Sequence, residues 1–200
     1  MIELPEAVVL SREIDETLSG KRIKQVIAAY SPHKFAWYHE DPQDYHNLLV
    51  NKTIHKSCNE GGFLKIEVDN NYLILLSEGV RLRYFLEGEP FPKKHQLLIE
   101  FSDHSFLVGS VQMYGGLCVF REGEYDNNYY RAAKEKPSPL TDGFNKKYFY
   151  RLVSESSGKL SLKGFLATEQ RIPGLGNGVL QDILYNARLH PKKKINTLKD

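Results

Sequence analysis

The sequence is poor in cysteine, and its two cysteines are not placed to define a framework. Cys58 and Cys118 lie 60 positions apart, and neither belongs to a Cys-X-X-Cys pair. This spacing supports neither a disulfide-stapled fold nor a cysteine-ligated zinc site. We therefore expect both residues to be buried free thiols.

Long apolar runs are also missing. A membrane-spanning helix needs about 18 or more consecutive apolar residues, and no stretch of this chain approaches that length. Residues 1–6 lack the basic and then apolar order of a signal peptide. With 41% hydrophobic and 26% charged residues, the composition is typical of a globular protein. We expect a soluble, cytoplasmic protein that does not contact membranes.

The net charge is small but unevenly distributed. The total is +2, yet residues 1–143 hold 16 Lys and Arg against 21 Asp and Glu, whereas residues 144–200 hold 11 against 4. A basic C-terminal part favours contact with a polyanion, because lysines and arginines that neutralise phosphates release condensed counterions. A solvated basic face without a partner is equally consistent with the charge alone.

One helix is predicted at the start of the chain, and β-strands follow it. Apolar residues recur at helical spacing from Ala7 to Leu18, with Pro5 in the first turn and Gly20 just beyond the end. Short runs rich in β-branched and aromatic residues then alternate with turn clusters at 69–71 and 102–104, a pattern typical of antiparallel hairpins. The predicted strands are residues 22–30, 63–68, 72–76, 81–85, 96–101 and 116–120.

The last part of the chain is predicted to be helical. Residues 122–139 are polar and interrupted by Gly and Pro, so we interpret them as a linker. Helical patterns follow at 148–153, 162–168 and 179–187. The predicted fold class is α+β, with an N-terminal helix and an antiparallel β-sandwich in residues 1–121 and an α-helical domain in residues 140–200.

A glycine-rich turn precedes the last predicted helix. Gly174, Gly176 and Gly178 permit positive φ angles and close approach of the backbone. The amides that open a helix also present the positive end of its dipole. The turn is therefore a candidate phosphate-binding site, although plain turns between helices use glycine as well. Asn177, at or next to the N-cap, could cap the helix or donate to a phosphate oxygen.

These residues resemble the helix-two-turn-helix DNA-binding motif of the formamidopyrimidine-DNA glycosylase and endonuclease VIII family. The matching stretches are IPGLGNG at 172–178, QDIL at 181–184 and ARLHP at 187–191. IELPE at 2–6 resembles the family's N-terminal PELPE, and PLTDGF at 139–144 resembles the entry to its helical domain. The resemblance spans nearly the whole chain, and it implies that residues 140–200 form the DNA-binding domain.

The resemblance implies that the reaction takes place at the N-terminus. In this family a free N-terminal amine, usually of proline, attacks C1′ of a damaged nucleotide, expels the base, forms a Schiff base and then cleaves the strand by elimination. Ile2 stands at the proline position, and Met is generally kept before a bulky residue, so the expected nucleophile is the amine of Met1. Glu3 matches the family's proton-shuttling carboxylate, although a glutamate at a helix start also compensates the dipole. Glu6 matches a second family glutamate, for which stabilisation of the helix start is an equally good account.

The resemblance also implies contacts with the DNA backbone and with the gap left by an everted base. Met113 and Tyr114 align with side chains that fill this gap. Two positions depart from the family pattern, because Gly62 stands where the family has a lysine and Glu78 where it has a gap-filling methionine. Lys194 extends the basic surface. The implied backbone-binding residues are Lys163, Gly174, Gly176, Asn177, Lys192 and Lys193.

Three functions follow as hypotheses. The leading one is a monomeric base-excision-repair glycosylase, with abasic-site lyase activity, that acts on duplex DNA containing a damaged base or an abasic site. The second is a non-catalytic protein that binds damaged DNA on the same fold, because Ile2 and Gly62 replace family residues. The third is an adaptor that uses the helix-two-turn-helix motif to bind RNA or protein. The family's four-cysteine zinc finger has no counterpart in these 200 residues, so we expect no metal or other cofactor in this chain.

Overall fold

The computed structural model describes residues 2–198, and its first element is the helix α1, Leu4–Leu18. Leu4, Ala7, Ile14 and Leu18 are buried along one face, which packs against the strands β3 and β4. Pro5 lies in the first turn, where its missing N–H removes no intrahelical hydrogen bond. The helix predicted from Pro5 to Leu18 is confirmed.

Seven strands follow α1 and form one hydrogen-bonded sheet. Neighbours along the path β1-β6-β7-β5-β4-β3 are antiparallel, and the short β2 pairs in parallel with β7. The turn clusters at 69–71 and 102–104 join β4 to β5 and β6 to β7, as predicted. The strands are β1 (Ile23–Ala28), β2 (Ala36–Trp37), β3 (Ile54–Glu60), β4 (Phe63–Val68), β5 (Tyr72–Phe85), β6 (Leu97–Phe101) and β7 (Phe106–Arg121).

The sheet folds over at an irregularity in β5. The first half of β5 pairs with the second half of β7, and the second half of β5 pairs with the first half of β7. The register shifts between Glu78 and Val80. The outer strands β1 and β3 approach each other through a bridge between Arg22 and Thr53. One continuous sheet therefore supplies both layers of the predicted sandwich, and the α+β class is confirmed. The runs predicted as two strands at 72–76 and 81–85 are the two halves of β5.

The main core lies inside this folded sheet, and α1 and the short helix α2, Tyr45–Leu49, contribute to it. Tyr45 is almost fully buried, and its hydroxyl lies 3.0 and 3.1 Å from the backbone oxygens of His39 and Leu117, which compete for its one proton. A short 3₁₀ turn, Pro42–Asp44, precedes α2. Among the fully buried aliphatic side chains are Leu18, Ile23, Leu49, Ile54, Leu64, Ile66, Ile74 and Leu76.

The segment interpreted as a linker, residues 122–139, contains a helix that its polar composition did not predict. This helix, α3, spans Asn128–Glu135, and the side chain of Asn127 caps it by accepting from the first backbone amides. Tyr130 is buried on the outer face of the sheet, in a cluster with Leu73, Leu75, Cys118 and Phe120. Much of this segment is therefore anchored to the sheet. The domain boundaries at residues 121 and 140 stay predictions.

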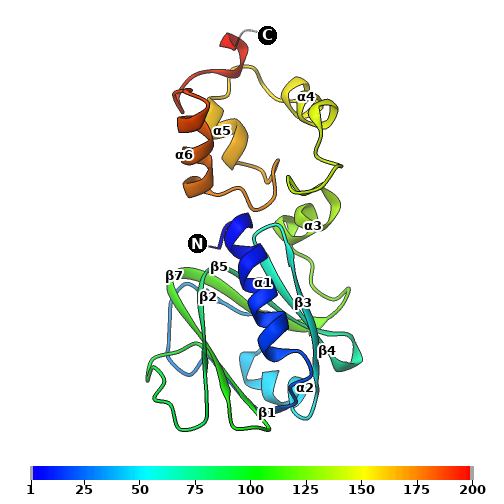
Figure 1. Ribbon diagram of the computed structural model, residues 1–200, viewed down its shortest axis with the longest axis vertical. Helices are drawn as coiled ribbons and strands as arrows, with labels where there is room; N and C mark the ends of the chain where they lie inside the picture. Colours follow the sequence, from blue (N-terminus) through cyan, green and yellow to red (C-terminus); the bar gives the residue numbers. More distant parts are fainter. Residues whose placement is uncertain (1, 199–200) are drawn as a thin grey trace.

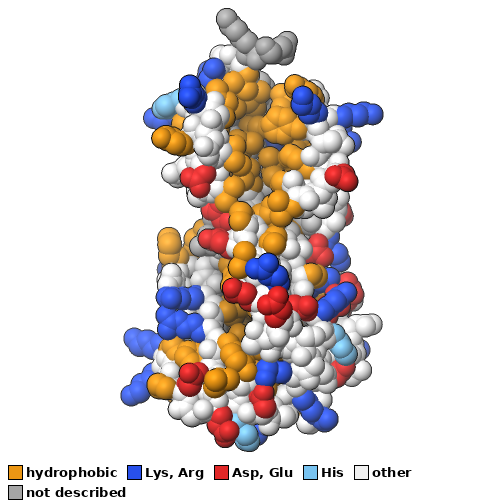
Figure 2. Space-filling model, viewed as in Figure 1, with side chains coloured by type: hydrophobic (Ala, Val, Ile, Leu, Met, Phe, Trp, Pro, Cys, Tyr) orange, Lys and Arg blue, Asp and Glu red, His pale blue; other side chains and the backbone are white. Residues whose placement is uncertain are grey.

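Three helices lie beyond the end of the sheet, namely α4 (Lys146–Glu155), α5 (Leu162–Ala167) and α6 (Asn177–Asn186). A 3₁₀ turn, Ile195–Thr197, is the last element among the described residues. Figure 1 shows this group at the opposite end of the molecule from α2, with the start of α1 between it and the sheet. Figure 2 shows apolar side chains lining a hollow among these helices. No helix among residues 2–198 is long and apolar enough to span a membrane. The buried core of the group is Leu152, Leu162, Phe165, Leu166, Ile172, Leu180, Leu184 and Ile195.

Candidate active site and nucleic-acid interface

The N-terminal segment is locked to the helical group by Glu3. The Glu3 side chain is buried, its Oε1 accepts from the backbone N–H of Gly178 at 2.8 Å, and its Oε2 accepts from Val179 at 2.8 Å. Glu3 precedes the first residue of α1. Its carboxylate compensates the dipole of another helix, α6, because it binds amides that lie 175 positions further along the sequence. The backbone N–H of Leu4 adds a bond to the oxygen of Gly174 at 2.8 Å.

Two glycines in the loop before α6 allow the helical group to pack closely against the N-terminal segment and the sheet. Gly174 has a φ of +78°, and a Cβ there would lie 2.7 Å from backbone atoms of Gly61 and Gly62. A Cβ on Gly176 would collide with the carboxylate of Glu3. The structure therefore places both glycines where the backbone of one region packs against the other. Their contact with phosphate stays a prediction, and two of the amides that open α6 already bind Glu3.

Ile2 is buried between the sheet and the helices, and its backbone N–H donates to the oxygen of Glu78 at 2.5 Å. Glu78 lies at the fold of β5 with a φ of +61°, an unusual backbone conformation for a non-glycine residue. Burial raises the pKa of its carboxyl group. The nitrogen at the position of the family's nucleophile is therefore an amide with a partner. The amine predicted as the nucleophile belongs to Met1, which lies outside the described residues.

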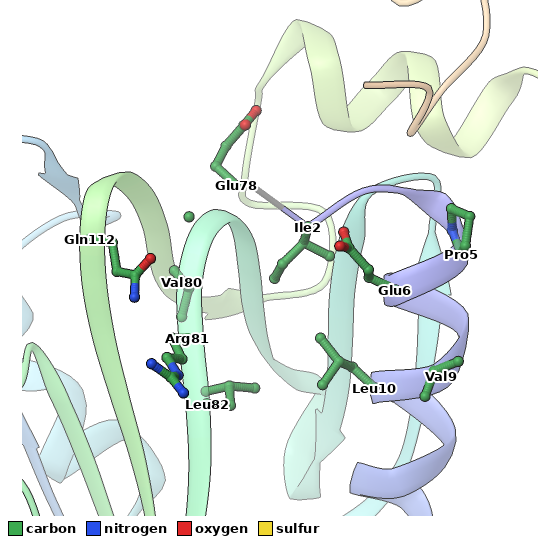
Figure 3. A pocket seen from close by; sticks show the side chains of 11 residues that line it. Ile2, Pro5, Glu6, Val9, Leu10, Glu78, Val80, Arg81, Leu82 and Gln112 are labelled. Carbon is green, nitrogen blue, oxygen red and sulfur yellow. The ribbon is translucent and has the colours of Figure 1, made fainter. Parts of the chain in front are cut away.

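Two cavities meet at Ile2. The larger, about 730 Å³, lies between α1 and the second half of β5, and its lining includes Ile2, Glu6, Glu78 and Arg81. Figure 3 shows the carboxylate of Glu6 beside Ile2, while the carboxyl group of Glu78 points away from the apolar side chains of Leu10 and Leu82. Glu6 accepts from the backbone N–H of Glu3 at 2.7 Å, so it stabilises the start of α1, as its sequence position allowed.

The smaller cavity, about 230 Å³, lies between the sheet and the helical group. Residues from both regions line it, among them Ile2, Glu78, Tyr114, Tyr129 and Asn177. Gly62, at the position of a family lysine, also lines it and brings no charge, and a Cβ at Gly62 would lie 3.0 Å from the backbone oxygen of Ile2. Carboxylates, backbone and aromatic rings therefore surround the N-terminal segment.

The predicted gap-filling residues lie beside this cavity on β7. Met113 is 72% exposed and Tyr114 is 36% exposed. A Cβ at Gly79 would lie 2.6 Å from the backbone oxygen of Tyr114, so the backbone of β5 packs closely against this part of β7. Both side chains are accessible from solvent, and their role as fillers stays a prediction.

The predicted backbone-binding residues lie near α5 and α6, where the asparagine and the lysines are exposed and the two glycines are half-buried. Asn177 is the first residue of α6, whose N-cap is Gly176, and its exposed amide caps no helix among the described residues. Lys163 donates its backbone N–H to the oxygen of Pro191 at 3.0 Å, which brings α5 beside the segment with Lys192, Lys193 and Lys194. None of these four lysines forms an ion pair with a residue in the range 2–198. They form a basic surface available to a polyanion.

Sequence reasoning missed two exposed aromatic side chains near the cavity. Trp37 on β2 is 50% exposed, and its ring centroid lies 5.7 Å from that of Tyr114. Tyr129 on α3 is 56% exposed and lines the smaller cavity. Tyr129 lies in a polar stretch and Trp37 in the short aromatic run FAWY at 35–38, and in both places an exposed aromatic residue is the available signal for a binding role.

The structure also shows where the two cysteines lie and whether side chains gather into a metal site. Cys118 is buried and Cys58 is half-buried, and both are free thiols. The expectation of two buried thiols is therefore correct for Cys118 and too strong for Cys58, because β3 is an outer strand of the sheet. Among residues 2–198, no group of three or more His, Cys, Asp and Glu side chains is arranged to hold a metal ion.

Comparisons with known proteins agree with this architecture. The model of the formamidopyrimidine-DNA glycosylase N-terminal domain matches residues 1–108. The formamidopyrimidine-DNA glycosylase of Bacillus anthracis is 26% identical over 99% of this chain and 71% of its own length, and that of Listeria innocua is 28% identical over 100% and 72%. A crystal structure of the Lactococcus lactis formamidopyrimidine-DNA glycosylase, non-covalently bound to DNA containing an abasic site, matches with a TM-score of 0.81 at 22% identity. The match covers 98% of this chain and 74% of the Lactococcus lactis chain, and it shows that the two share a fold. The chain belongs to the formamidopyrimidine-DNA glycosylase family.

Proposed function

We propose that this protein is a DNA glycosylase that removes damaged bases from duplex DNA and cleaves at abasic sites through its N-terminal amine. The observation that carries the proposal is the position of the N-terminal segment. Ile2 lines both cavities, and Glu3 fixes this segment to the helix that also carries Asn177. The residue that precedes Ile2 is thereby attached to the segment that lines both cavities, between the sheet and the helical group that carries the basic surface.

The chemistry follows from the amine and its neighbours. A free α-amine has a pKa near 8, so a useful fraction is neutral and nucleophilic at physiological pH. Attack on C1′ forms a carbon–nitrogen bond, and the base leaves with the glycosidic electron pair and takes up a proton. The nitrogen then loses a proton and the C1′–O4′ bond breaks, so that O4′ takes up a proton and stays on C4′ as a hydroxyl while C1′ becomes the carbon of the Schiff base. Elimination of the 3′ phosphate then cleaves the strand. The nitrogen of Ile2 is an amide that donates to Glu78, so we assign the nucleophile to the amine of Met1.

Proton transfer requires a carboxylate close to this amine, and the site offers three. Both oxygens of Glu3 accept backbone amides, so any role of Glu3 in proton transfer has to use its remaining lone pairs. Glu6 has one oxygen bound to the N–H of Glu3. The carboxyl group of Glu78 is half-buried beside both cavities, and burial raises its pKa, so it takes up a proton more readily than an exposed glutamate does. We propose that Glu78 supplements Glu3 in this role.

The second candidate is a non-catalytic protein that binds damaged DNA. Two observations favour it, namely the amide at the nucleophile position of Ile2 and the uncharged backbone at Gly62. In this reading the basic surface and the aromatic residues bind distorted DNA, and no covalent step follows.

The two candidates differ in their products. A labelled duplex that contains one oxidised purine is incubated with the protein, and base release, strand cleavage and binding are measured on the same sample. The first candidate predicts free base and cleaved strand, both lost when the N-terminal amine is acetylated. Binding without either product supports the second candidate. Equal competition by a duplex RNA of the same sequence would contradict both and favour an RNA-binding adaptor.

A further inference from the structure

An exposed apolar surface continues outward from the smaller cavity, from Met113 and Tyr114, which the family resemblance assigns, to Phe35 and Trp37, which it does not. Its members are Phe35, Trp37, Met113 and Tyr114, and their exposed fractions are 48%, 50%, 72% and 36%. Large apolar side chains exposed next to one another mark a binding surface more often than chance exposure does. Tyr114 belongs both to this surface and to the lining of the cavity, so the two are continuous.

The surface is held rigidly by the sheet. Trp37 lies on β2, which pairs with Gly115 and Gly116 of β7, and the backbone N–H of Gly115 donates to the oxygen of Phe35 at 3.0 Å. A Cβ on Gly115 would lie 2.8 Å from the side chain of Val80. Backbone pairing therefore fixes the backbone of Trp37 beside Tyr114, and the contact between the two rings adds to this arrangement.

The geometry of the rings suits a flat ligand. The centroids of Trp37 and Tyr114 are 5.7 Å apart, their planes differ by 34°, and both side chains are partly exposed. The ammonium of Lys34 lies 5.3 Å from the centroid of the Phe35 ring, which places a positive charge at the edge of the surface. Aromatic faces combined with a neighbouring cation are what an unpaired nucleotide requires, with stacking for the base and charge for the phosphate.

We propose that Trp37, supported by Tyr114, stacks on an unpaired DNA base beside the smaller cavity. The proposal rests on the proposed function, because it assumes that the protein binds DNA with this face. It deepens that function by naming the preferred substrate, which is DNA in which a base next to the reaction site has lost its partner. Stacking is tolerant of base identity because every base has an aromatic face, so the preference is for an unpaired base rather than for a sequence.

The test uses the fact that Trp37 is the single tryptophan of the chain. Two duplexes of one sequence are titrated into the protein, one fully paired and one with a reduced abasic site that leaves the opposite base unpaired. Fluorescein anisotropy gives affinity, and tryptophan fluorescence reports on Trp37 alone. We expect stronger quenching with the unpaired base. The Trp37→Ala variant should bind that duplex about 5- to 150-fold more weakly, the range that base–aromatic stacking gives on substitution by alanine, and should bind the paired duplex within about twofold of the native protein.

Three further measurements separate stacking from other causes. Trp37→Phe keeps a ring and should recover most of the lost affinity, which a misfolded variant would not do. Trp37→Ala should leave the slope of log affinity against log salt unchanged, because no phosphate contact is removed. Tyr150→Ala removes a ring that is 65% exposed on α4, away from this surface, and should bind both duplexes as the native protein does.

The outcomes are distinct. If Trp37 is quenched equally by both duplexes, or if Trp37→Ala weakens both by the same factor, the stacking proposal is wrong while DNA binding stands. If the native protein binds neither duplex, the proposed function itself fails.

Discussion

Replacement of Glu3 by glutamine should weaken the attachment of the helical group to the N-terminal segment. The two oxygens of Glu3 accept the backbone amides of Gly178 and Val179 at 2.8 Å in a buried position. A glutamine of nearly the same shape has one oxygen for one amide and turns its NH₂ group towards the other. One hydrogen bond is lost, a buried N–H is left without an acceptor, and the remaining bond loses its charge assistance.

The magnitude follows from these three changes. A hydrogen bond to a charged group contributes about 1.5–3 kcal/mol and a buried unpaired N–H costs about 1–3 kcal/mol, while removal of a charge at a helix N-terminus costs about 0.3–1 kcal/mol. Because these contributions overlap, we expect Glu3→Gln to lower the free energy of unfolding by about 3 kcal/mol. Urea denaturation at pH 7, followed by far-ultraviolet circular dichroism and by the fluorescence of Trp37, measures this change.

Glu6→Gln is the matched control. Glu6 is exposed and accepts one bond, from the backbone N–H of Glu3, and a glutamine oxygen can accept the same bond. Its effect should stay below about 1 kcal/mol. A loss for Glu3→Gln below about 0.5 kcal/mol, or an equal loss for both variants, would refute the assignment of Glu3 as the lock between the two regions.

Four other predictions concern separate parts of the molecule. Gly176→Ala should lower stability by about 2–3 kcal/mol, because its Cβ would collide with Glu3, and thermal denaturation checks this. Lys163→Ala should weaken binding to all duplexes alike and reduce the salt slope by about 1, as titrations at several salt concentrations will show. Burial raises the pKa of Cys118 to about 11, so iodoacetamide at pH 8 should leave it unmodified in the native protein and alkylate it in urea, which peptide mass spectrometry detects. The hydrogen bond from Lys21 holds the pKa of Asp103 below its usual range, so this pair stabilises the protein above about pH 4 and the stabilisation is lost as the pH falls. Asp103→Asn should lower the free energy of unfolding by about 0.5–1 kcal/mol at pH 7. In the variant, the free energy of unfolding should also fall less steeply with decreasing pH, as urea denaturation at several pH values will show.

Local patterns in the sequence account for most of the elements. The helix α1 follows from apolar spacing and Pro5, and β4 occupies the predicted residues 63–68. The strand β3, Ile54–Glu60, was missed because its sequence IHKSCNE is mostly polar, and it is a strand because β4 pairs with it at an edge of the sheet. The helix α3 was missed for a similar reason, since the burial of Tyr130 against the sheet stabilises it.

The site was only partly accessible from the sequence. Motif resemblance selected Glu3 and Asn177, and the structure brings both to the start of α6. The partner of Glu3 could not be predicted, because a contact across 175 residues leaves no local pattern. Trp37 was also missed, because β2 lies beside Tyr114 only through its pairing with β7.

The most direct test of the account is to trap the covalent intermediate at the N-terminus. Protein that begins with Met1 is mixed with a duplex containing one abasic site, borohydride is added to reduce any Schiff base to a stable secondary amine, and mass spectrometry locates the linkage. We expect a single adduct on the α-amine of Met1, absent from protein whose N-terminus is acetylated. Tight binding with no adduct, or an adduct on a lysine side chain, would contradict it.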